Sequence, residues 1–375
     1  MQAYKKRGFW IGLGVFFFIL LAPAPESLSP IGWAVAAVTL LMAIWWATEA
    51  VPVAVTALLP LALFPLLHVT DFQTAALPYA NKNIYLFMGG FILALGIESS
   101  GLHKRLALKM LIAIGSSGAN LVGGFMLVSA LISMWVMNTS TTLMLLPIGL
   151  AVCTTIAETI PHFSAKERKN FETALLLGIA YAASIGGMST LIGTAPNIVF
   201  VGIMQETYGI EISFIDWMKL GVPIAAIMLF TSWYTITKFV YPVNFIASME
   251  TRLQLRNMLT DLGPMGRDEK KVLVIFSFAA GAWMLRSLLD NFIPLSGLTD
   301  AGIAILAALC FFFIPSENNK TDLLTWEQAN KLPWGLLVLF GGGLSMAASI
   351  GASGLGDWIG QGLIVLASVP PIILI

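Results

Sequence analysis

The sequence predicts an all-α protein that crosses a membrane many times. Of the 375 residues, 58% are hydrophobic and only 11% are charged, whereas charged residues make up about 25% of a soluble domain. The mean hydropathy is +0.86. Basic and acidic residues number 20 each, so the net charge is zero and does not point to a polyanionic partner. This composition excludes a cytosolic enzyme, a nucleic-acid binder and a disordered chain.

Long apolar runs mark the expected spans, because a membrane-crossing helix needs roughly 20 mostly apolar residues. The expected spans are residues 9–22, 31–49, 53–67, 84–99, 173–204, 217–241, 271–289, 300–315 and 334–350. Lys5, Lys6 and Arg7 precede the first run, as they would in a signal peptide. Since the rest of the chain is also membrane-embedded, we interpret this run as a first span.

The basic residues indicate the orientation, because cytoplasmic segments carry an excess of Lys and Arg. With a cytoplasmic N-terminus, and with segment 119–158 entering and leaving on one side, all basic residues except Lys82, Lys219 and Arg286 are cytoplasmic. A single crossing by 119–158 would abolish this bias. Two full crossings would preserve it equally well, but the polar run 138–142 favours a re-entrant hairpin.

Two further segments are expected outside the membrane core. Residues 101–115 mix basic and apolar side chains, which predicts an amphipathic helix at the cytoplasmic surface. Residues 242–270 are polar and charged, and we expect them to form the longest cytoplasmic loop.

The sequence contains an internal repeat with an offset of 253 residues. The run Leu86-Phe87-Met88-Gly89-Gly90-Phe91 matches Leu339-Phe340-Gly341-Gly342-Gly343-Leu344, and Ser100-Gly101-Leu102 matches Ser353-Gly354-Leu355. In the expected topology the two copies run in opposite directions, an inverted arrangement common in secondary transporters. The alternative is that two unrelated spans share glycines for close helix packing.

The first candidate site is the hairpin tip, which contains Ser133 and the run Asn138-Thr139-Ser140-Thr141-Thr142. Polar, irregular backbone at membrane depth is tolerated only inside protein or around a cavity. Asn and Thr offer oxygens to a cation and donors to a carboxylate. The half-helix after the tip would point its N-terminus at a bound anion. The alternative is a Ser/Thr-rich packing face.

The second candidate site is the run from Ser184 to Asn197, which predicts a broken helix. Gly186, Gly187 and Gly193 permit unwinding and close backbone approach. Pro196 suits the first turn of the following half-helix, and Thr194 can cap that turn or bind an anion. The alternative is a kinked helix used only for packing.

The hairpin tip, the broken-helix run and the paired glycine helices together resemble the divalent anion/sodium symporter (DASS) family. The resemblance covers nearly the whole chain. It implies an inverted-repeat transporter that works as a homodimer, in which a transport domain moves like an elevator against a scaffold. The implied organisation is scaffold-type spans plus an amphipathic helix in 1–115, a transport-type region in 119–241 (hairpin 119–158, broken helix 173–204, span 217–241), a cytoplasmic loop in 242–270, second-repeat scaffold spans in 271–362, and the start of a second hairpin in 363–375.

The resemblance also implies which residues bind the ligands. Substrate would contact Asn138, Thr139, Thr194, Pro196 and Asn197, and sodium would contact Ser133, Asn138 and Gly193. Met137 stands where the family usually has a serine, and a thioether is a poor sodium ligand, so sodium binding should be weakened. The second hairpin and its broken helix would lie beyond Ile375, so we expect this chain to be C-terminally incomplete and not to transport alone.

The expected function is sodium-coupled symport of succinate, malate, fumarate or citrate across the inner (cytoplasmic) membrane. The alternative is a sodium-independent dicarboxylate exchanger of the same family. We expect no enzyme activity, no nucleic-acid partner and no cofactor beyond sodium as the coupling ion. Ser353 lies in a Gly-x-Ser-Gly run like that of intramembrane proteases, but no histidine follows position 162 to serve as its base. A channel would need rings of charge or a carbonyl filter, and the inverted repeat favours alternating access instead.

Overall fold

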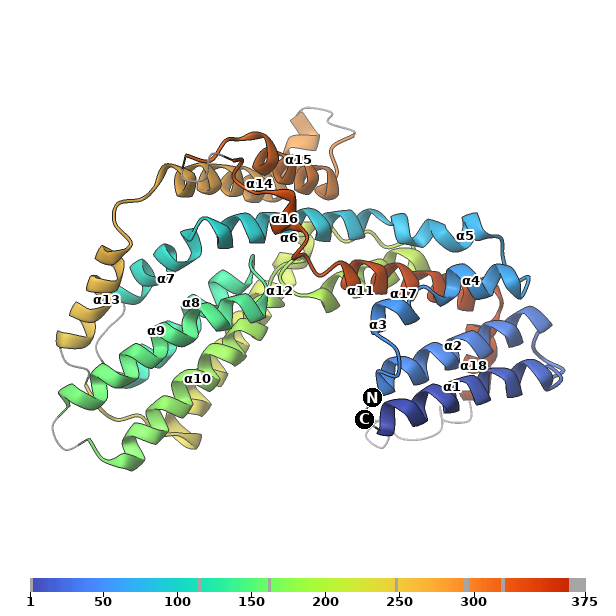
Figure 1. Ribbon diagram of the computed structural model, residues 1–375, viewed down its shortest axis with the longest axis horizontal. Coiled ribbons are helices and arrows are strands. Elements are labelled where there is room, and N and C mark those ends of the chain that lie inside the picture. The colour runs from blue at the N-terminus through green and yellow to red at the C-terminus, as the bar shows by residue number, and fades with distance from the viewer. Residues whose placement is uncertain are drawn as a thin grey trace. The chain divides into compact units, whose positions relative to one another are not determined.

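The computed structural model describes residues 3–113, 117–160, 163–246, 249–292, 297–317 and 321–363. All named elements within these ranges are helices, and the only β pairing is in two isolated bridges (Figure 1). The prediction of an all-α protein is therefore confirmed. The expected start of a second hairpin, 363–375, lies outside the described residues apart from its first residue.

The chain divides into two compact units, and the first consists of Met1–Ile84, Val199–Glu211 and Pro333–Ile375. Its helices are α1 (Ala3–Leu21), α2 (Pro30–Thr48), α3 (Val53–Thr56), α4 (Leu59–Leu66), α5 (Phe72–Ala76), the 3₁₀ turn η1 (Leu77–Ala80), α17 (Trp334–Ala352) and α18 (Leu355–Leu363). Ser29 caps α2 by accepting from the Gly32 N–H at 3.0 Å. The α1–α2 contact is close: a Cβ on Gly12 would stand 2.5 Å from Nε1 of Trp45.

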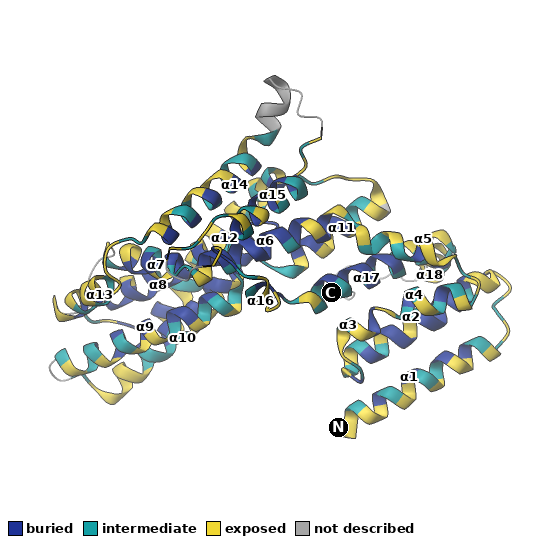
Figure 2. Cartoon of the chain, turned by 45° about the horizontal axis from the view of Figure 1, so that its top comes forward, coloured by how far each residue is buried: buried dark blue, intermediate teal, exposed yellow. Residues whose placement is uncertain are grey.

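The second unit consists of Tyr85–Ile198 and Ile212–Leu332. Its helices are α7 (Leu102–Ile112), α8 (Gly118–Ser133), α9 (Asn138–Thr159), α10 (Ala165–Gly187), α12 (Phe214–Tyr234), the π-helical turn η2 (Thr235–Val240), α13 (Met249–Asp261), α14 (Arg267–Phe292), α15 (Asp300–Phe313) and α16 (Trp326–Ala329). Helices α8, α9 and α10 lie side by side, and most of α8 is buried (Figures 1 and 2). Two more helices, α6 (Lys82–Ser99) and α11 (Ala195–Tyr208), have residues in both units.

Within the described residues, four helices are long and apolar enough to cross a membrane: α2, α9, Phe214–Val240 and α17. The bent pair Phe72–Ala80 and Lys82–Ser99 would make a fifth. Residues 53–67, expected as one span, instead form the short helices α3 and α4, which both begin beside a proline. The expected loop 242–270 contains the helix α13, in which Thr251 and Leu255 are buried. Hydropathy did not predict this helix because most of its residues are polar.

The internal repeat is visible as the same local turn in both copies. Gly101, after α6, has φ +76°, and Gly354, after α17, has φ +75°, so both adopt the left-handed conformation that ends a helix and favours glycine. The preceding serines also match, since Ser100 Oγ donates to the Ile97 carbonyl at 3.1 Å and Ser353 Oγ to the Ile350 carbonyl at 3.3 Å. The 253-residue offset therefore repeats a helix–turn–helix unit, which a shared glycine pair alone does not explain.

Candidate functional site

The first helix break lies between α8 and α9, at residues 134–137. This break lies within the tip expected from the sequence, Ser133 to Thr142, whereas the polar run 138–142 forms the first turns of α9, directly after the break. Its threonines are compatible with helix because they can donate to the helix backbone, as Thr142 Oγ1 does to the Asn138 carbonyl at 2.8 Å. Met137 is the N-cap residue and its side chain makes no capping hydrogen bond.

The second break separates α10 from α11 and spans residues 188–194, within the broken helix expected from the sequence. Side chains hold it in shape. Asn197 Nδ2 donates to the carbonyls of Gly187 at 2.9 Å and Thr190 at 2.7 Å. Thr190 Oγ1 accepts from the Gly193 N–H at 3.1 Å and donates to the Met134 carbonyl. The last bond joins the second break directly to the first.

The two breaks meet around Gly187. Ser133 Oγ donates to Asn138 Oδ1 at 2.6 Å. A Cβ on Gly187 would stand 2.5 Å from that same Asn138 oxygen, and a Cβ on Gly193 would stand 2.4 Å from the Gly187 carbonyl oxygen. The expected sodium residues Ser133, Asn138 and Gly193 are thus grouped in one place. Hydroxyl, amide and carbonyl oxygens are the donors that a hard cation takes.

The expected substrate residues differ in accessibility. Thr139 and Pro196 are exposed and Thr194 is half-buried, all at or beside the first turns of α9 and α11. Asn197 is 6% exposed, and both its N–H groups can be engaged by the two carbonyls of the second break. Sequence reasoning assigned no role to Thr190, and it named Gly187 only for unwinding and close backbone approach. The single local signal was their place within the glycine-rich run.

Aromatic side chains anchor the first break to the rest of its unit. Trp135, inside the break, stacks on Phe214 with a ring separation of 5.9 Å and on Trp283 at 6.4 Å. It also meets Phe276 edge-on at 5.0 Å. The second break is anchored separately, since Trp217 Nε1 donates to the Met188 carbonyl at 2.9 Å. A tryptophan therefore links each break to α12: Trp135 of the first break packs on Phe214 of α12, and Trp217 of α12 bonds to the second break.

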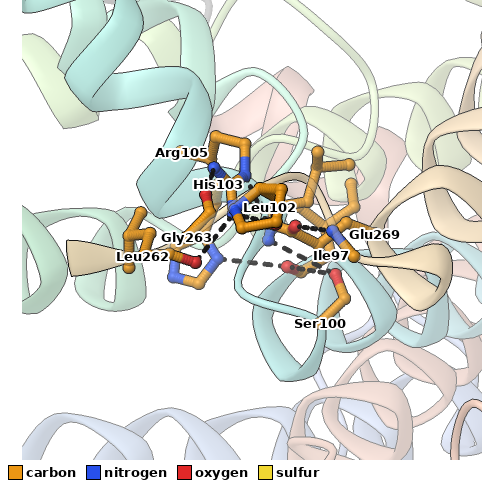
Figure 3. A network of polar contacts seen from close by, with 10 residues as sticks. Ile97, Ser100, Leu102, His103, Arg105, Leu262, Gly263 and Glu269 are labelled. Atoms are coloured by element: carbon orange, nitrogen blue, oxygen red, sulfur yellow. Dashed lines mark hydrogen bonds and ion pairs between the residues drawn. The ribbon is translucent and has the colours of Figure 1, made fainter. Parts of the chain in front are cut away.

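A buried polar network lies at the start of α7 (Figure 3). Arg105 Nε donates to Glu269 Oε1 at 2.8 Å, and its guanidinium also donates to the Gly263 carbonyl at 2.8 Å. His103 Nδ1 lies 3.1 Å from the Ile97 carbonyl, and burial lowers the pKa of His103. The Arg105 contacts fix α7 to the first turn of α14 and to the turn before it, and the His103 contact links α7 to α6. No group of three or more His, Cys, Asp or Glu side chains in the described ranges could hold a metal ion.

Comparison with known proteins gives consistent relatives. The family model described as "Sodium:sulfate symporter transmembrane region" matches residues 5–375. A Staphylococcus saprophyticus protein named sodium-dependent dicarboxylate transporter SdcS is 39% identical over 373 residues, covering 98% of this chain and 72% of the relative. The protein of the same name from Staphylococcus aureus strain USA300 is 38% identical over 381 residues, covering 100% of this chain and 73% of the relative.

Proposed function

We propose that this chain, which belongs to the sodium:sulfate symporter family, moves dicarboxylates or tricarboxylates such as succinate, malate, fumarate or citrate across a membrane together with sodium ions. The family expected from the motifs is the family that the comparisons identify. The observation that carries the proposal is the meeting of two helix breaks, with oxygen donors from both, around Gly187.

Sodium would be held by the Ser133 hydroxyl, the Asn138 amide oxygen and the backbone at Gly193. In the structure Ser133 donates to Asn138, so a bound cation requires this hydroxyl to rotate and turn its lone pairs toward the ion. That rotation is available because a hydroxyl proton has no fixed position. Asn138 has one oxygen for the cation and an NH₂ group for a carboxylate, so a single side chain can couple the two ligands.

Substrate carboxylates would bind at the starts of α9 and α11. The first N–H groups of a helix have no partner within it and carry partial positive charge, which favours an anion. Thr139 and Thr194 would add hydroxyl donors, and exposed Pro196 would form part of the wall. Asn197 would not contact the substrate but would hold the second break in the conformation that places Thr194 and the start of α11 at the site.

Met137 is the feature that bears on the coupling ion. Its thioether supplies no hard oxygen at the N-cap of α9, and it makes no capping bond. Weak sodium binding follows, and this favours the second candidate, a sodium-independent exchanger with the same carboxylate site.

The movement proposed is an elevator motion in a homodimer. Residues 119–241 would be the moving part, and 1–115 with 271–362 the scaffold, in the inner cell membrane with a cytoplasmic N-terminus. The direct test is uptake of labelled succinate into liposomes by a protein that carries this sequence together with a complete second repeat, since the chain covers 72% of its relative. We expect uptake with an inward sodium gradient and none with an equal potassium gradient. Exchange with internal succinate that ignores sodium would favour the second candidate, and neither uptake nor exchange would refute a carboxylate carrier.

A further inference from the structure

Thr141 is fully buried in the first turns of α9, and its hydroxyl has no hydrogen-bond partner among the residues that the structure describes. A buried hydroxyl left without a partner costs about 1–3 kcal/mol. Such a group inside a packed helix bundle therefore calls for a reason.

Other threonines of the same helix show that an internal partner is available. Their hydroxyls donate to the carbonyl four residues earlier, with oxygen–oxygen distances of 2.7–3.1 Å. These threonines are Thr142, Thr154, Thr155 and Thr159. Thr141 instead holds its hydroxyl away from the Met137 carbonyl, which accepts only from the Thr141 N–H at 3.0 Å. The Thr141 hydroxyl is thus unpaired within the described residues, whereas those four threonines donate theirs to the helix backbone.

The position of Thr141 connects this oxygen with the meeting point of the two breaks. It follows Asn138 by three residues and Met137 by four, so all three lie on one side of the helix. The neighbouring helix α10 runs antiparallel, because Gly187 approaches Asn138 while Ile179 and Leu175 approach Gly149. Thr141 therefore faces the end of α10, within about one turn of the Asn138 amide.

Burial without a partner is not by itself the argument. Thr39, Thr56 and Thr251 are also buried or half-buried with partnerless hydroxyl oxygens, and they lie in α2, α3 and α13. What distinguishes Thr141 is its place one turn from Asn138, an expected cation ligand, and from Met137. Thr251 in particular offers a matched comparison, since it is as buried as Thr141 but belongs to another helix.

We propose that Thr141 Oγ1 is a further oxygen ligand of the coupling sodium ion, and that it supplies from the next turn the oxygen that Met137 does not. The inference rests on the proposed function, since it requires a sodium ion at Ser133 and Asn138. A threonine hydroxyl has two lone pairs for a cation, and the cation would compensate the buried oxygen that the protein leaves free.

The test measures sodium binding without transport. The purified chain is heated in increasing sodium chloride, with potassium chloride keeping the ionic strength constant, and the unfolding midpoint is recorded. A ligand that binds only the folded state raises this midpoint. We expect Thr141→Val to raise the sodium concentration for half-maximal stabilisation about tenfold, as loss of one good ligand would. Thr141→Ser and Thr251→Val should behave like the parent, and Met137→Ser added to Thr141→Val should restore sodium binding.

The outcomes separate this inference from the proposed function. If Thr141→Val keeps the parental sodium curve, or if Thr251→Val shifts it equally, Thr141 is a packing residue and the inference is overturned. If Thr141→Val does not fold, Thr141→Ala and its combination with Met137→Ser provide the same comparison. If the parent shows no stabilisation specific to sodium, the sodium site itself fails, and this inference fails with it.

Discussion

Asn197→Ala decides between two roles for one residue. The family resemblance implies that Asn197 is a substrate ligand, whereas its amide donates to the carbonyls of Gly187, just before the second break, and Thr190, within it, at 2.9 and 2.7 Å. The side chain is only 6% exposed, so water does not readily replace those bonds. The Gly187 carbonyl would lose its donor, whereas the Thr190 carbonyl still accepts from the Gly193 N–H at 3.4 Å. A buried carbonyl without a partner costs about 1–3 kcal/mol, so the variant should lose about that much folding free energy. Asn197→Asp should be no better, because an ionised carboxylate cannot donate to a carbonyl.

The assay is the unfolding midpoint of the detergent-purified protein, together with succinate binding. We expect both Asn197 variants to lower the midpoint by several degrees. Asn330→Ala removes an exposed asparagine amide from another part of the same unit and should leave the midpoint unchanged. A parental midpoint combined with weakened succinate binding in Asn197→Ala would refute the reasoning and make the amide a substrate ligand.

Four further predictions follow from the same geometry. Asn138→Ala should abolish succinate binding while leaving the folded protein and its oligomer size unchanged; parental affinity by equilibrium binding would refute its role. Met137→Ser should raise the apparent sodium affinity of uptake, and an unchanged sodium dependence would mean that this side chain does not face the ion. Single cysteines at Asn120, in the first turn of α8, and at Lys166, in the first turn of α10 after the hairpin, should react with a membrane-impermeant reagent from the cytoplasmic side only; labelling of either from outside would exclude a re-entrant hairpin. Burial lowers the pKa of His103, so the unfolded state binds the proton more readily, and stability present above about pH 6.5 should be lost as the pH falls below it. His103→Gln should flatten that dependence in thermal unfolding, and an unchanged pH profile would contradict it.

Helices whose ends coincide with caps could be predicted closely from the sequence. The expected span 31–49 is α2 (Pro30–Thr48), where Ser29 caps the helix and Pro30 begins it. The expected span 334–350 is α17 (Trp334–Ala352). In both cases a long apolar run and a local stop signal occur at the same place, so hydropathy and backbone geometry agree.

Where side-chain polarity and backbone geometry disagree, hydropathy misplaces the structure. The polar side chains are at 138–142, but the helix is interrupted earlier, at residues 134–137, which are Met, Trp, Val and Met. That break depends on Trp135 packing on Phe214 and Trp283, which lie far away in the sequence. For residues 249–261 the error is the opposite one: polarity predicted a loop, but the segment forms a helix that buries Thr251 and Leu255.

The candidate site divides in the same way. Ser133 and Asn138 are five residues apart and could be paired from the sequence, and their hydrogen bond of 2.6 Å joins the two sides of one break. Thr190 could not, because its role is a bond to the Met134 carbonyl, 56 positions earlier, which no local pattern encodes. Spacing can therefore pair candidate ligands within one break, while the contact between breaks is a property of the folded chain.

The repeat shows which level of structure is duplicated. Gly101 and Gly354 share a left-handed backbone conformation, and matching serines precede both, although the helices that follow differ in sequence. In the first copy Arg105 fastens the helix by donating to Glu269. At the matching position in the second copy stands Trp358, whose Nε1 donates to Ser27 Oγ at 2.8 Å. The backbone turn is common to both copies, and each copy attaches its helix through a different donor to a different neighbour. The two turns have the same backbone conformation, but different hydrogen bonds hold the helices α7 and α18 that follow them. A change at Arg105 should therefore loosen α7 without affecting α18.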